Sequence, residues 1–178
     1  MPPPKIPAIV ADVEKLNAPF KPKAHELLAL IEEHRLPMVV FETLRPLERQ
    51  KWLFQKGYSR ASGANGPHCW GLAIDVVLDP KSKEWKEIGD RPIAVGGGGA
   101  PWDTGYDPTA DGLVLRRAGV AHVVREFIAL ARRLGLECGG VNEGPWANRE
   151  KGAEFGWDPF HVQLSGWRAW TRHLPQPS

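Results

Sequence analysis

The sequence predicts a single domain that combines helices with short strands. Its 178 residues are enough to bury one hydrophobic core. Two patterns support the mixed class. Three segments carry apolar residues at helical spacing, and three short apolar runs are bounded by turn-forming or polar residues. No internal repeat divides the chain, so we expect one domain spanning residues 1–178.

The first third of the chain predicts two helices and a strand after an N-terminal arm. Residues 1–20 are expected to form this arm, which begins with a proline-rich stretch. Residues 21–34 have leucines and an isoleucine on one helical face and predict the first helix. The apolar run 36–41 predicts a buried strand. Pro46 is expected to begin a second helix, which Gly57 ends.

The rest of the chain predicts two strands and the longest helix. The strands are expected at 72–78 and 160–164, and the helix at 120–134, ending at Gly135. Residues 79–119 are rich in Gly, Pro, Asp and Trp and predict a long irregular loop. Its run of four glycines lacks the Lys-Ser/Thr pair and the following helix of a phosphate-binding loop.

Charge, hydrophobicity and cysteine spacing exclude several classes of function. The net charge is only +2 and no cluster of Lys or Arg occupies one face, so nucleic-acid binding is not expected. No apolar stretch is long enough for a signal peptide or a membrane span. Cys69 and Cys138 have no metal-binding or disulfide-framework spacing, and we expect both to be reduced in a protein made in the cytoplasm. Most of the eight Trp are expected as core or rim anchors.

His68 and Asp75 form the first group of candidate functional residues. His68 ends a Gly/Asn-rich loop, and Asp75 lies within an apolar strand. A carboxylate at the centre of such a strand costs several kcal/mol unless a cation or hydrogen-bond donors compensate it. A metal ion is one possible partner, and an Arg or backbone donors are another.

A second group is Asp158 and His161. In the strand at 160–164, alternation places His161 and Gln163 on the face opposite Phe160, Val162 and Leu164. If this strand neighbours that of Asp75, the polar residues meet on one surface. Two histidines and one carboxylate would leave a coordination position open, which is typical of catalytic rather than structural zinc sites.

Asp158 and Arg45 are candidates for catalytic roles around such a site. Asp158 lies three residues before His161, at a turn made by Pro159, where a carboxylate could serve as a general base; an ordinary turn residue is the alternative. Arg45 lies where a strand gives way to a helix and could stabilise an oxyanion or hold a substrate carboxylate. A surface ion pair is its alternative role. The other four histidines, at 25, 34, 122 and 173, are expected to be solvated or structural.

Together these motifs resemble the zinc peptidases that include VanY-type D-alanyl-D-alanine carboxypeptidases and phage L-alanyl-D-glutamate endolysins. The family motif Ser-x-His-x-x-Gly-x-Ala-x-Asp is matched over residues 66–75 at its His, Gly, Ala and Asp. The acidic residue three before a His is matched by Asp158 and His161. Arg45, Gln50 and Gly57 resemble the family's Arg and Gln-containing helix, and residues 134–140 resemble the Gly-Gly segment of the endolysin-like branch.

The resemblance, which covers roughly residues 37–165, carries several implications. It implies an α+β fold in which a small antiparallel sheet is flanked by helices, the hedgehog/DD-peptidase-like zinc peptidase fold. His68, Asp75 and His161 correspond to zinc (Zn2+) ligands and Asp158 to the catalytic base. Arg45 corresponds to an oxyanion-stabilising or substrate-binding residue, and Gln50 is also expected to bind substrate.

The chain departs from the family at several places. Gly66 replaces the usual Ser of the first motif, and the segment at 138–142 differs from the Trp-Gly-Gly-Asp-Trp pattern of the endolysin-like branch. The loop at 79–119 is also longer than expected. These departures bear on the choice of substrate more than on metal binding.

The leading hypothesis is a monomeric, zinc-dependent peptidoglycan peptidase that hydrolyses a stem-peptide amide, with L-Ala–D-Glu as the expected bond. A D-Ala–D-Ala carboxypeptidase and a non-catalytic wall-binding protein that retains the metal site are the alternatives. A cysteine hydrolase using Cys69 is disfavoured, since neighbouring residues such as His68 usually point apart. Without a signal peptide, the enzyme would reach the wall after release, as in phage or prophage lysis.

Overall fold

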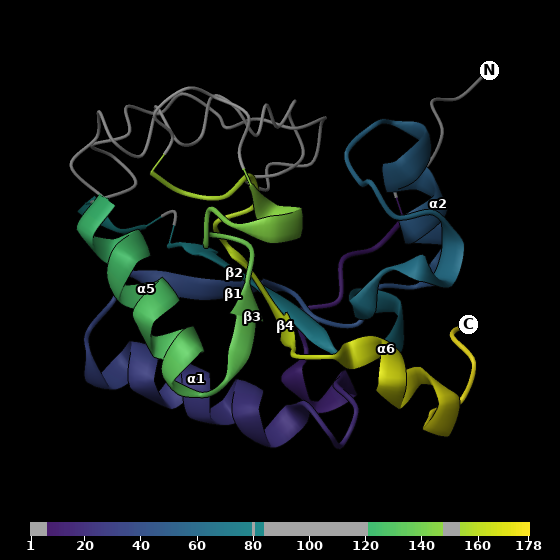
Figure 1. Cartoon of the computed structure of the whole chain (residues 1–178), viewed down its shortest axis with the longest axis horizontal. Helices are drawn as coiled ribbons and strands as arrows, with labels where there is room; N and C mark the ends of the chain where they lie inside the picture. The colour runs from purple at the N-terminus through teal and green to yellow at the C-terminus, as the bar shows by residue number, and fades with distance from the viewer. Residues whose placement is uncertain (1–6, 80, 84–120, 148–153) are drawn as a thin grey trace.

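A computed structural model describes residues 7–79, 81–83, 121–147 and 154–178 and has an α+β fold (Figure 1). Its four strands are β1 (Met38–Glu42), β2 (Ala73–Leu78), β3 (Leu136–Cys138) and β4 (His161–Leu164). They form one antiparallel sheet in the order β1-β2-β4-β3. The α+β class and the antiparallel sheet expected from the sequence are confirmed.

Helices lie at both ends of this sheet. Helix α1 (Lys21–Glu33) and helix α5 (Ala121–Arg133) lie together on the left of Figure 1, whereas α2 (Leu47–Gln55) and the short α6 (Trp167–Trp170) lie on the right. Short 3-10 turns lie at Val13–Lys15, Gly63–Asn65, Pro67–Trp70, Gly144–Trp146 and Thr171–His173. The three predicted helices all form, with ends within two residues of the expected positions.

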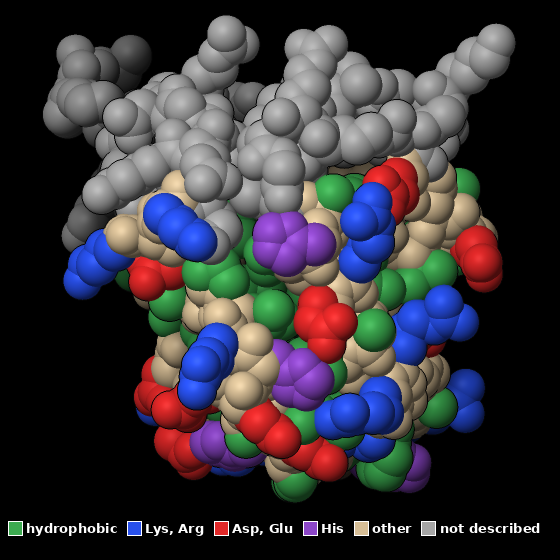
Figure 2. Space-filling model, turned by 90° about the vertical axis from the view of Figure 1, so that its left-hand side faces the viewer, with side chains coloured by type: hydrophobic (Ala, Val, Ile, Leu, Met, Phe, Trp, Pro, Cys, Tyr) green, Lys and Arg blue, Asp and Glu red, His purple; other side chains and the backbone are tan. Residues whose placement is uncertain are grey.

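The hydrophobic core lies between the sheet and the α1/α5 pair. Helix α5 buries a stripe of apolar residues that includes Phe127 and Leu130, and α1 buries Leu27 and Ile31. This is the helical periodicity from which both helices are predicted. Figure 2 shows the outer side of this region, where side chains of both charges are interspersed with apolar ones. None of the helices in the described residues is long and apolar enough to cross a bilayer.

Three features of the fold add to or differ from the sequence-based expectations. Strand β3 is an unpredicted edge strand of three residues. Residues 7–20 of the expected arm lie against the domain, because Leu16 and Phe20 are buried in the core and Thr43 donates to the carbonyl of Val10. The predicted loop at 79–119 falls, apart from residues 79 and 81–83, outside the described residues.

The strand register places polar residues in a row across the sheet. Asp75 on β2 lies opposite His161 on β4, and an irregularity between Val40 and Glu42 brings Glu42 on β1 opposite Asp75. One step along, Gln163 of β4 lies opposite Glu137 of β3. Directly opposed side chains project from the same face, so the sheet presents these polar groups together.

Candidate metal centre

Three elements bring His68, Asp75 and His161 together. Asp75 and His161 are cross-strand neighbours, and His68 comes from the 3-10 turn Pro67–Trp70 just before β2. That turn ends at Gly71, whose φ of 59° is left-handed. A Cβ there would also lie 3.0 Å from the backbone nitrogen of Asn17, so only glycine suits the position.

The donor atoms of these three residues converge on one point. His68 Nε2 lies 3.1 Å from Asp75 Oδ1 and 3.1 Å from His161 Nδ1. His161 Nδ1 lies 3.0 Å from the same Asp75 oxygen. Tetrahedral zinc with bonds of about 2.0–2.2 Å holds neighbouring ligand atoms about 3.3–3.5 Å apart. The triangle therefore fits a small divalent ion once its ligand atoms move apart by a few tenths of an ångström.

Outer hydrogen bonds leave the lone pairs of both histidines facing this point. His68 Nδ1 donates to the carbonyl of Thr43 at 2.8 Å, which leaves Nε2 unprotonated in the neutral ring. His161 Nε2 donates to Gln163 Oε1 at 3.0 Å, which leaves Nδ1 unprotonated. The Gln163 amide is itself oriented, because its NH2 donates to Glu137 at 2.6 Å. Three buried or half-buried acceptors thus face one another, an arrangement that a cation would satisfy.

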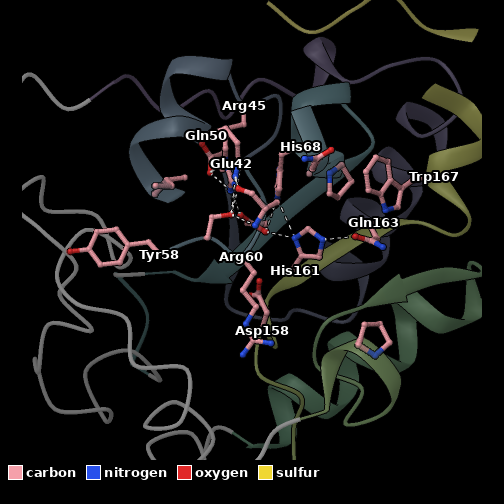
Figure 3. A pocket seen from close by; sticks show the side chains of 18 of the residues that line it. Glu42, Arg45, Gln50, Tyr58, Arg60, His68, Asp158, His161, Gln163 and Trp167 are labelled. Carbon is pink, nitrogen blue, oxygen red and sulfur yellow. Dashed lines mark hydrogen bonds and ion pairs between the residues drawn. The ribbon is translucent and has the colours of Figure 1, made fainter. Parts of the chain in front are cut away.

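The second oxygen of Asp75 is held by a charge network. Arg45 Nη2 donates to Asp75 Oδ2 at 3.3 Å and to Glu42 at 2.5 Å (Figure 3). Glu42 is 1% exposed and also accepts from Arg49 Nε at 2.5 Å. Each of the three candidate ligands therefore has an outer partner, the pattern that fixes ligand orientation in protein metal sites.

The protonation tendencies of Asp75 and His68 agree with a ligand set, whereas an ion at His161 would have to displace a proton. Burial opposes ionisation of Asp75, but the charge of His68 and the hydrogen bonds of both histidines hold its pKa well below the usual range. Burial lowers the pKa of His68 and favours its neutral form. For His161, burial is outweighed by the hydrogen bond and charge of Asp75, so its pKa is raised. An ionised carboxylate beside a neutral imidazole is what metal coordination requires.

Asp158 lies beside this cluster without forming part of the triangle. It is half-buried, and burial raises its pKa to about 6, with a further upward contribution from the charge of Asp75. A close backbone approach sets its position, because a Cβ at Gly139 would lie 2.2 Å from the carbonyl oxygen of Asp158. A carboxyl group with a pKa near 6 is suited to exchange protons around neutral pH.

These residues share one pocket of about 500 Å³. Its lining includes the three candidate ligands, Asp158, and the side chains of Trp146 and Trp157. The two indole rings are tilted by 30° with centroids 5.2 Å apart, and the centroid of the Trp146 ring lies 5.1 Å from that of His161. A pocket of this size beside a potential metal site can admit several residues of a peptide.

Arg45 and Gln50, the other two residues predicted from the sequence, are hydrogen-bonded to neighbouring protein groups. Arg45 donates to Glu42, Gln50 and Asp75, so most of its donors are engaged within the protein. Gln50 is 0% exposed, and its NH2 donates to Ser59 and to the carbonyl of Ala61. Both polar atoms of its side chain contact Arg45 or the 59–61 segment, and its contact with substrate stays a prediction.

The remaining candidates have simpler environments. The histidines at 25, 34, 122 and 173 are exposed, as the sequence indicates. Cys69 and Cys138 are free and buried, and burial raises the pKa of the Cys69 thiol to about 11. A Cβ at Gly66 would lie 3.3 Å from that of Ala61 and 3.6 Å from Gln50 Oε1, so the departure from Ser accompanies tight local packing.

Sequence reasoning missed the outer partners of the ligands. Gln163 could have been found, because it shares a strand face with His161. Glu137 could not, since its three-residue strand has no detectable period. Thr43 contributes a backbone carbonyl, which no side-chain motif records.

Comparison with known proteins adds little. No family model matches the chain, and no curated protein matches it. Among solved structures, the Serratia marcescens L-Ala D-Glu endopeptidase ChiX is similar, with a TM-score of 0.43 and 20% identity over 89% of this chain and 86% of that chain. A likeness at this level assigns neither fold family nor function.

Proposed function

We propose that this chain is a zinc-dependent peptidase that hydrolyses a stem-peptide amide of peptidoglycan, with L-Ala–D-Glu as the bond cleaved. The observation that supports this most is the convergence of His68, Asp75 and His161 in a pocket that Asp158 also lines. The resemblance of residues 66–75 and 158–161 to the motifs of zinc peptidases supplies the substrate class.

The protein side chains divide the work of hydrolysis. His68, Asp75 and His161 would hold the ion, which, when bound, would polarise the scissile carbonyl and promote ionisation of water near neutral pH. Asp158 takes a proton from the water whose oxygen adds to the carbonyl carbon. As the C–N bond breaks, Asp158 returns that proton to the leaving amine. Arg45 orients Asp75, since its guanidinium donates to the outer carboxylate oxygen.

The proposal is tested by locating the bond that is cut. Zinc-loaded protein is incubated with purified cell wall and with a synthetic pentapeptide stem, and the new termini are identified by mass spectrometry. We expect a new amino terminus on D-Glu, with loss of this product after chelation and recovery on addition of zinc. Release of D-Ala alone would establish the carboxypeptidase alternative, and binding to the wall without any new terminus would establish the non-catalytic one.

A further inference from the structure

Four arginines line the pocket, and they differ in whether a carboxylate already satisfies them. Arg45 and Arg49 both donate to Glu42. Arg60 and Arg168 are exposed, and neither lies within ion-pair distance of a carboxylate in the described part of the chain. The pocket therefore offers two guanidinium groups to an incoming anion.

Arg60 differs from Arg168 in being on the side of the candidate base. Its guanidinium carbon lies 4.2 Å from the ring centroid of Trp157, the residue preceding Asp158. Figure 3 shows Arg60 beside Asp158, below His161, and the charge of Arg60 acts on the Asp158 carboxyl. Arg168 instead lies 4.6 Å from the ring of Trp167, which Figure 3 shows near Gln163.

Contact with an indole face leaves hydrogen-bond donors of Arg60 available. The guanidinium carbon lies over the Trp157 ring, and this cation–π contact uses no N–H donor. The N–H groups of a guanidinium lie in its own plane. Those in-plane donors match a carboxylate, which they can bind in a bidentate manner. Because Trp157 packs against Trp146 and donates its indole N–H to the carbonyl of Pro145 at 2.9 Å, the ring under Arg60 is itself held in place.

We infer that Arg60 is a specificity-determining residue that binds a free carboxylate on the carbon carrying the leaving amine. This rests on the proposed function, in which Asp158 protonates that amine. In an L-Ala–D-Glu bond, the carbon next to the leaving nitrogen bears the α-carboxylate of D-Glu. The ligand class is therefore a peptide with this carboxylate free, and conversion to the neutral amide of D-isoglutamine removes the group that Arg60 binds.

Two peptides that differ only in this carboxylate test the inference. For the zinc-loaded protein we expect kcat/KM to be about 10–100-fold higher for the D-Glu peptide than for the D-isoglutamine peptide, the range of a charge-assisted hydrogen bond. Arg60→Gln should abolish this preference by slowing only the D-Glu peptide, and Arg60→Lys should restore part of it. Arg168→Gln, the matched control, should leave the preference intact. A preference that survives Arg60→Gln overturns the inference.

Binding to a catalytically impaired protein separates this inference from the proposed function. Calorimetric titration of the zinc-loaded Asp158→Asn protein with each peptide should show tighter binding of the D-Glu form, and addition of Arg60→Gln should remove the difference. Equal affinities of the two peptides for Asp158→Asn would overturn the role of Arg60. Selective binding by Arg60 without cleavage of the D-Glu peptide by the wild-type protein would instead overturn the proposed reaction alone.

Discussion

Replacing Asp158 with asparagine should strongly reduce activity and, in the metal-free protein, increase the free energy of unfolding. Burial raises the pKa of this carboxyl from its ordinary 3.8 to about 6. The native state therefore binds the proton more tightly than the unfolded chain does. As pH rises from about 4 to about 6, the unfolded chain ionises Asp158 first, and the free energy of unfolding falls.

The magnitude follows from the shift in pKa. A difference of about 2 units corresponds to about 3 kcal/mol at 1.36 kcal/mol per unit, and partial solvent access to Asp158 reduces this to about 1–3 kcal/mol. Asparagine has nearly the same shape and cannot ionise. The Asp158→Asn protein therefore does not lose the stability that ionisation of the buried carboxyl costs the wild type. The gain should be complete above about pH 6 and should vanish below about pH 4.

Urea unfolding of the chelated proteins at about pH 7.5 and about pH 4 measures this gain, with Glu33→Gln at the exposed end of α1 as the control carboxylate. The zinc-loaded Asp158→Asn protein should lose about 10²–10⁴-fold in kcat, the usual contribution of a general base. Equal stability of wild type and variant at pH 7.5 would refute the inferred pKa shift. Unchanged turnover in the variant would refute the role as base.

Three further substitutions test the supporting groups. Gln163→Leu leaves the Nε2–H of His161 without its acceptor and should weaken zinc binding about 10–100-fold, measured by competition with a chromophoric chelator; unchanged affinity would show that the outer hydrogen bond does not matter. Glu42→Gln leaves Arg49 without its carboxylate and Arg45 with Asp75 alone, and should cost about 3–5 kcal/mol in urea unfolding, whereas a loss below about 1 kcal/mol would contradict the buried network. Cys69→Ser should retain wall hydrolysis, because burial raises the pKa of the thiol to about 11; loss of hydrolysis with retained zinc would revive a cysteine mechanism.

Alternation along two strands was enough to predict much of the site. Asp75 and His161 are polar residues within apolar runs, and their shared facing follows from the two-residue period of a strand. The structure shows the strands to be neighbours with these two residues directly opposed. His68 follows from the same motif, since a left-handed glycine turns the chain between it and the strand.

What alternation could not provide was the register and its consequences. The irregularity before Glu42 shifts that residue opposite Asp75, and no pattern in the local sequence predicts this irregularity. As a result Arg45, for which the sequence predicts a substrate or oxyanion contact, also donates to Glu42 and Asp75. The need for glycine at 139 follows only from the structure, in which the backbone of Asp158 leaves no room for a Cβ.

The most direct test of the central claim is the zinc stoichiometry of the purified protein. Equilibrium dialysis against zinc followed by metal analysis should give one tightly bound ion per wild-type chain. His161→Ala and Asp75→Asn should each lose it, while Asp158→Asn should keep it. Absence of saturable binding to the wild-type chain, or retention of the ion by His161→Ala and Asp75→Asn alike, would contradict the assignment of His68, Asp75 and His161 as a metal centre.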